Sequence, residues 1–223
     1  GGAVYAHQVP QVIKSVFLKN SAVANDGNGG ALYIKNDDPE NYSNFCEFTS
    51  CRFEENKAGN IGGAIYQNSK YADLKISYCT FVDNHADKKD YGLDNSYYYS
   101  PGHSIYNTGS YKSIDMCWFG TNSPDFKGQL AEYHTWADDE DHKPSNYLRI
   151  YIKLNESSDL YVGNPYKVIV YFQSTKGNSL SKDLLHSNGT LYGDGEFSNA
   201  KVDLNDMTAY VVLTKENPTI FGK

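Results

Sequence analysis

Residues 62–84, GGAIYQNSKYADLKISYCTFVDN, contain two short motifs that recur along the chain. The first motif, Gly-Gly-Ala followed by an aliphatic residue and Tyr, stands at residues 1–5, 29–33 and 62–66, with the degenerate form Gly-His-Ser-Ile-Tyr at 102–106. The second motif, Phe-x-x-Asn, follows each copy, at residues 17–20, 53–56, 81–84 and 119–122. Four copies of two motifs in a fixed order indicate short strand-rich coils that stack and share one core.

Alternation along a strand assigns the side chains of the first motif to two opposite faces. The aliphatic residue is expected to point into the core and the Tyr outward, so that the tyrosines form an exposed vertical row. The paired glycines predict a tight bend, where a side chain would collide with the next coil. The tyrosine row consists of Tyr5, Tyr33, Tyr66 and Tyr106.

The second motif predicts two further rows. Its Phe is expected in the core, and its Asn in the following turn, where the side chain can bond backbone groups of neighbouring coils. The structural ladder predicted in this way consists of Phe17, Phe53, Phe81 and Phe119 together with Asn20, Asn56, Asn84 and Asn122.

The four cysteines follow the same repeat. Cys51, Cys79 and Cys117 each precede the motif Phe by two residues, and Cys46 also falls at a predicted core position. We expect them to pack as small hydrophobic residues, because a catalytic thiol needs an electropositive and partly exposed site. Stacked neighbours could also come close enough for a disulfide, and the sequence leaves that pairing open.

These motifs resemble a known repeat. Gly-Gly-Ala-[Ile/Leu/Val] followed by Phe-x-x-Asn is similar to the repeat of the chlamydial polymorphic outer-membrane proteins, which form right-handed parallel β-helices. Residues 117–126, CWFGTNSPDF, resemble the element that closes the β-helix in adhesin-like surface proteins of methanogenic archaea. In that family an immunoglobulin-like domain usually follows the helix. The resemblance covers roughly residues 1 to 215.

The second half of the chain has a different pattern. An acidic stretch with a proline, residues 138–144, breaks the repeat and indicates a domain boundary. Beyond it, apolar and polar residues alternate in short runs separated by Gly and Asn turns, as in a small antiparallel sandwich. Together with the resemblance, this pattern predicts an all-β fold. The C-terminal coils of a right-handed parallel β-helix are expected over 1–130, a linker over 131–146, an immunoglobulin-like β-sandwich over 147–216, and the start of a linker to a further domain over 217–223.

The composition of the chain limits the classes of binding partner that we expect. The formal net charge of −7 over 223 residues argues against nucleic acid, whose phosphates require a basic face. No apolar run is long enough to span a membrane. Three Asn-x-Ser/Thr sequons, at Asn41, Asn155 and Asn188, fit an extracellular, cell-surface location. Because the chain begins inside a repeat, we expect it to be a fragment. We also expect a monomer.

An enzyme is the main alternative, because parallel β-helices include polysaccharide lyases and glycoside hydrolases. Hydrolysis of a glycosidic bond requires two carboxylates that face one substrate. The coils offer carboxylates only at scattered repeat positions, accompanied by a single arginine, Arg52. We therefore expect no catalytic residue. The carboxylates considered are Glu47, Glu54, Glu55, Asp73, Asp83 and Asp115.

Metal and cofactor signals are weak. Asp138, Asp139 and Asp141 could supply oxygen ligands to Ca²⁺, but the spacing of a calcium-binding loop is missing and such acidic runs are usually solvated. No two of the histidines stand at a metal-ligand spacing. We expect no cofactor.

The tyrosines are the strongest binding candidates, because exposed aromatic side chains with a polar tip suit sugar rings and protein surfaces. Tyr91, Tyr97, Tyr98 and Tyr99 lie in the longest inserted loop, where binding residues often occur. Tyr33, Tyr66 and Tyr106 belong to the repeat row, which would equally well stack on itself to stabilise the sheet. With the resemblance, these features favour an adhesin that attaches non-covalently to glycans or proteins of neighbouring cells. A structural spacer is a further alternative.

Overall fold

The computed structural model describes residues 1–7, 10–36, 44–69, 72–87, 100–109, 111–132, 143–154, 159–180, 184, 189–192, 194–203 and 206–216. Over these ranges the chain is built from β-strands, with one short helix, α1 (Phe126–Gln129). The predicted all-β class is confirmed. Two compact units form: unit 1 comprises residues 1–148 and 174–185, and unit 2 comprises residues 149–173 and 186–223.

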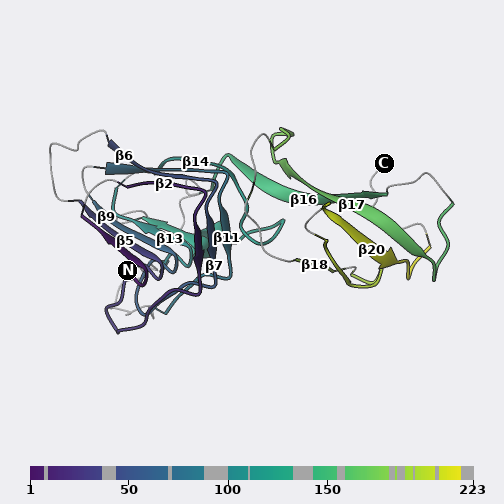
Figure 1. Cartoon of the computed structure of the whole chain (residues 1–223), viewed down its shortest axis with the longest axis horizontal. Helices are drawn as coiled ribbons and strands as arrows, with labels where there is room; N and C mark the ends of the chain where they lie inside the picture. Colours follow the sequence, from purple (N-terminus) through teal and green to yellow (C-terminus); the bar gives the residue numbers. More distant parts are fainter. Residues whose placement is uncertain are drawn as a thin grey trace, which may run out of the picture. The chain divides into compact units, whose positions relative to one another are not determined.

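Unit 1 consists of successive coils that each contribute one strand to several parallel sheets (Figure 1). The first sheet contains β1 (Val4–Ala6), β5 (Leu32–Asn36), β9 (Ile65–Ser69), β13 (Ile105–Asn107) and β15 (Leu130–Glu132). The second contains β2 (Gln11–Ile13), β6 (Asn44–Thr49), β10 (Ala72–Ser77) and β14 (Tyr111–Cys117). The third contains β3 (Val16–Leu18), β7 (Arg52–Glu54) and β11 (Thr80–Val82), and the fourth β4 (Ser21–Ala22), β8 (Lys57–Ala58) and β12 (His85–Ala86).

The register of these sheets places equivalent motif residues on top of one another. Phe17 pairs with Phe53, and Phe53 with Phe81, in the third sheet. Their rings stack face to face at centroid distances of 4.9 and 5.0 Å, and Phe81 stacks on Phe119 at 5.5 Å. The predicted phenylalanine ladder is therefore present. It forms the centre of a core that the aliphatic residues of the first motif complete.

The two glycines of the first motif have different roles. Gly29 and Gly62 adopt φ of +66° and +68°, a left-handed conformation that glycine adopts without strain. The second glycine is needed for space, since a Cβ on Gly63 would lie 2.0 Å from the carbonyl oxygen of His103 in the next coil. The predicted close approach of coils at this bend is confirmed.

The asparagine ladder holds three of its four predicted members. Asn20, Asn56 and Asn84 each follow a residue with left-handed φ. Oδ1 of Asn56 accepts hydrogen bonds from the backbone N–H and Nδ2 of Asn20, and Oδ1 of Asn84 accepts the equivalent two from Asn56. Asn122 is exposed, so its place in the ladder is a wrong prediction. The reason is Gly120, whose φ of +77° turns the chain one residue earlier than in the other coils.

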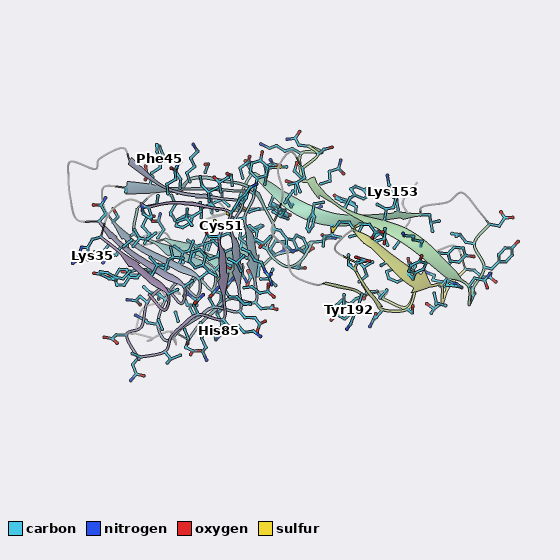
Figure 2. The ribbon with its side chains drawn as sticks, viewed as in Figure 1. Lys35, Phe45, Cys51, His85, Lys153 and Tyr192 are labelled. Carbon is cyan, nitrogen blue, oxygen red and sulfur yellow. The ribbon has the colours of Figure 1, made fainter. Side chains whose placement is uncertain are left out.

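All four cysteines are free and fully buried in the core of unit 1, where Figure 2 labels Cys51. Cys51, Cys79 and Cys117 occupy equivalent positions, and the backbone N–H of Cys51 donates to Sγ of Cys79 at 3.3 Å. Their predicted role as packing residues agrees with this burial.

Unit 2 is built around an antiparallel pair. Strands β17 (Pro165–Ser174) and β20 (Thr208–Val212) run antiparallel, with β16 (Asn146–Leu154) beside β17. A second, two-stranded sheet, β18 (Thr190–Leu191) with β19 (Ala200–Lys201), packs against them through a separate apolar core. The start of β16 and the residues after Gln173 belong to unit 1. Strand β15 extends the repeat stack into the stretch that the sequence assigns to a linker.

Candidate functional site

The tyrosine row of the repeats exists but is largely covered. Tyr5, Tyr33, Tyr66 and Tyr106 are in register, and successive rings lie 5.0, 4.9 and 5.8 Å apart. Tyr5 is 51% exposed, but Tyr66 and Tyr106 are only 8% and 5% exposed. The expectation of an exposed row is therefore wrong for these two residues.

The buried end of the row packs against Ile61, which precedes the Gly-Gly motif, and against Ala131 of β15, which pairs with Tyr106 in the same sheet. Ile61 and Ala131 pack with Tyr66 and Tyr106 into a small apolar cluster on the outer face of the first sheet. Burial, followed by the neighbouring tyrosines, raises the pKa of Tyr66 to about 12. At this end the row acts as a second core layer, and Tyr5 and the half-buried Tyr33 remain the more accessible members.

Several predicted residues lie outside the described residues. These are Tyr91, Tyr97, Tyr98 and Tyr99 of the long loop, and Asp138, Asp139 and Asp141 of the acidic stretch. Among the residues that the structure describes, no group of three or more His, Cys, Asp or Glu side chains is arranged to hold a metal ion.

The carboxylates of the coils are tied to neighbouring polar groups. Glu47 accepts hydrogen bonds from Gln11 at 2.9 Å and from Lys75 at 3.2 Å, which lower its pKa. Arg52 Nε donates to Glu54 at 2.6 Å within one strand. Asn146 Nδ2 donates to Asp115 at 2.7 Å, and Lys19 lies 3.5 Å from Glu55. Each of these contacts holds a carboxylate in place in a side-chain pair.

A histidine pair links the third coil to the fourth. The rings of His85 and His103 stack at 4.8 Å and 12°, and the N–H of Ala86 donates to Nδ1 of His103. Burial, and then the neighbouring His85, lower the pKa of His103. His85 in turn contacts Asp87, which pairs with Lys57 at 3.0 Å. This arrangement favours a neutral His103 because Nδ1 must accept a hydrogen bond.

Burial holds two of the thiols in their unreactive, protonated form. Burial, and then the carboxylate of Asp73, raise the pKa of Cys46 to about 12. The pKa of Cys79 is also raised well above its usual range, first by burial. A thiolate is the nucleophilic form, so these residues are packing groups.

The structure also exposes a surface that the sequence analysis did not single out. On unit 2, Tyr151, Lys153, Lys167, Tyr171 and Tyr210 lie on the face of the sheet opposite the core, and we call this the tyrosine–lysine face. The signal was the alternation of residues 148–154, in which Tyr151 and Lys153 fall between apolar residues. Alternation separates the two faces but does not say which partner covers them.

Comparison with known proteins identifies the repeat. Residues 14–35 and 50–68 match the family model of the Chlamydia polymorphic membrane protein repeat. The match supports a repeat protein of this type. Each matched segment begins near a Phe-x-x-Asn motif and ends just after the next Gly-Gly-Ala motif, and together the segments cover well under half of the chain. No curated protein and no solved structure matches the chain.

A membrane-crossing helix is not among the elements found: within the described residues, none is both long and apolar enough to span a bilayer. The family match supports a protein associated with the outer membrane or cell surface.

Proposed function

We propose that this chain is part of a cell-surface adhesin that attaches non-covalently to glycans or proteins of neighbouring cells. In this proposal unit 1 is a right-handed parallel β-helix, and unit 2 is an immunoglobulin-like sandwich. The observation that carries the proposal is the match of two segments to a membrane-protein repeat, on coils whose motif residues stack in register.

The organisation of the side chains supports binding without catalysis. The Phe and Asn ladders occupy the interior of the coils, and the coil carboxylates described above make local pairs with basic or amide side chains. A stack of this kind gives a rigid scaffold in which each coil contacts its neighbours. Aromatic side chains that remain on the outside, such as Tyr210 at 67% exposed, supply contact area.

Binding and sugar release measured in the same wells test this proposal. The labelled chain is incubated with intact microbial cells and with immobilised cell-wall glycans, and an unrelated acidic protein of similar size serves as the control. We expect saturable retention above that control, without release of reducing sugar. Absence of retention on every surface would contradict adhesion, and release of reducing sugar would favour a lyase or hydrolase.

A further inference from the structure

The tyrosine–lysine face is the outer side of the sheet in unit 2. Val168 and Val170 of β17 are buried in the core of this unit. Residues between and beside them in the strand therefore point to the opposite side. Figure 2 shows Lys153 on the side of unit 2 away from Tyr192, which follows β18. The face is thus separate from the two-stranded sheet.

One end of the face combines two tyrosines with a lysine. The rings of Tyr151 and Tyr171 stack across β16 and β17 at 5.7 Å and 25°. Lys153 Nζ lies 5.7 Å from the ring centroid of Tyr171, and its side chain is exposed. No carboxylate among the described residues lies within ion-pair distance of Lys153. The exposed ammonium of Lys153 thus lies beside an aromatic surface, where it can meet an anionic group.

The other end combines a tyrosine with an ion pair. Lys167 pairs across the strands with Tyr210, and its Nζ lies 6.0 Å from the ring centroid. Asp206 Oδ2 accepts a hydrogen bond from Lys167 at 3.1 Å, an interaction that raises the pKa of the lysine. A lysine beside an aspartate offers donors and acceptors together, which suits sugar hydroxyls. Lys167 and Tyr171 are four residues apart in β17, or about 14 Å along the strand.

We propose that the tyrosine–lysine face binds an acidic glycan, with a sugar carboxylate on Lys153 and sugar rings along Tyr171 and Tyr210. This inference rests on the proposed adhesive function and names its ligand class and site. Aromatic side chains contact the apolar faces of sugar rings, and their hydroxyls bond at the rim. Lys153 supplies charge complementarity for one carboxylate.

A short acidic sugar fits this face better than nucleic acid does. Binding to a phosphate backbone requires many cations along one track. This face instead presents few cations: Lys153, Lys167, which is paired with Asp206, and Arg149, which the alternation of β16 places on the same side. A formal charge of −7 on the whole chain also repels a long polyanion.

A pair of probes that differ only in charge tests the proposal. A trisaccharide of galacturonic acid and its fully methyl-esterified form are titrated into the 223-residue chain by calorimetry. We expect the acidic trisaccharide to bind more tightly than the ester, and added salt to weaken it. We expect Lys153→Gln and Tyr171→Ala each to weaken binding about fivefold or more, which corresponds to about 1 kcal/mol.

Matched variants separate this face from general surface effects. Lys153→Arg keeps the charge and should retain binding, whereas Tyr192→Ala removes a tyrosine that is 69% exposed on the other side and should change nothing. Tyr210→Ala gives a second aromatic test if Tyr171→Ala unfolds. Equal binding of both trisaccharides, or full binding by the Lys153→Gln and Tyr210→Ala variants, would overturn the inference. Retention of these variants on intact cells would leave adhesion standing through another surface, and absence of retention by the unaltered chain would remove both proposals.

Discussion

At the scale of single residues, the stack depends on buried polar side chains that bridge coils. Asn56 Oδ1 accepts hydrogen bonds from the backbone and the side chain of Asn20, and its Nδ2 donates to Phe17 O and to Asn84 Oδ1. Asn56 is fully buried, so its hydrogen-bonding groups are shielded from solvent. A buried donor or acceptor that loses its partner costs about 1–3 kcal/mol.

Replacement of Asn56 by alanine should therefore lower the free energy of unfolding by about 3 kcal/mol, because it leaves several buried groups unpaired. Chemical denaturation measures this change. Asn122→Ala is the matched control, because Asn122 holds the same motif position but is exposed, and its effect should stay within about 0.5 kcal/mol. Equal effects of the two variants would contradict the role assigned to the ladder.

The cysteines give a second test at this scale. Burial raises the pKa of Cys46 and Cys79, which keeps these two thiols protonated at pH 8, and all four cysteine side chains are buried away from reagents in the folded protein. Ellman's reagent should leave the native chain unmodified and should modify all four thiols after denaturation. Rapid, stoichiometric reaction of the native protein would show that the thiols are accessible and that the core description is wrong.

At the scale of the elements, the bends set how closely coils approach. Gly63→Ala would place a Cβ 2.0 Å from the carbonyl oxygen of His103, which belongs to backbone and cannot rotate away. We expect a loss of about 3 kcal/mol or more in the free energy of unfolding, or failure to fold. Gly189→Ala meets nothing within 4 Å and should be neutral. Thermal unfolding of both variants, with circular dichroism as a check on folding, decides between these outcomes.

The histidine pair gives this region a pH dependence. The pKa of His103 is lowered in the folded state, so the unfolded chain takes up a proton first as the pH falls below about 6.5. By linkage the free energy of unfolding then decreases with falling pH. His103→Gln should reduce this decrease between pH 7 and 5, and His7→Gln, at an exposed residue, should not. The charged groups that act on His103 are His85, Asp87 and Asp125, and both variants keep all three. An unchanged pH profile in His103→Gln would contradict the neutral state assigned to this ring.

Some features of the elements were predictable from the sequence, and others were not. The phase of the repeats predicted the stacking of Phe17, Phe53 and Phe81, because a shared core requires equal residues at equal positions. The burial of Tyr66 and Tyr106 was not predictable from alternation, since their cover comes from Ile61 and Ala131, outside their own strands. Asn122 left its ladder because the left-handed residue moved to Gly120. The outcome for the tyrosines was decided by residues outside the motif, and the outcome for Asn122 by a residue within it.

The tyrosine–lysine face was missed for a related reason. Residues 148–154 show clear alternation, which fixes that Tyr151 and Lys153 share a side of their strand. Whether that side is covered or open depends on strands β17 and β20, which are far along the chain. Burial of Val168 and Val170 identifies the core side, and so the face that remains.

At the scale of the whole molecule, the chain combines a repeat scaffold with a separate antiparallel unit. The first provides internal ladders that repeat from coil to coil, and the second carries the tyrosine–lysine face. Adhesion is the proposal that connects these features with the family of the matched repeats.

Attachment of chain-coated beads to intact cells tests that claim most directly. Beads that carry the 223-residue chain are counted on a cell layer after washing, with and without an excess of the free chain. We expect attachment that the free chain abolishes and that beads carrying an unrelated acidic protein do not show. Attachment equal to that of the control beads, or unaffected by the free chain, would contradict it.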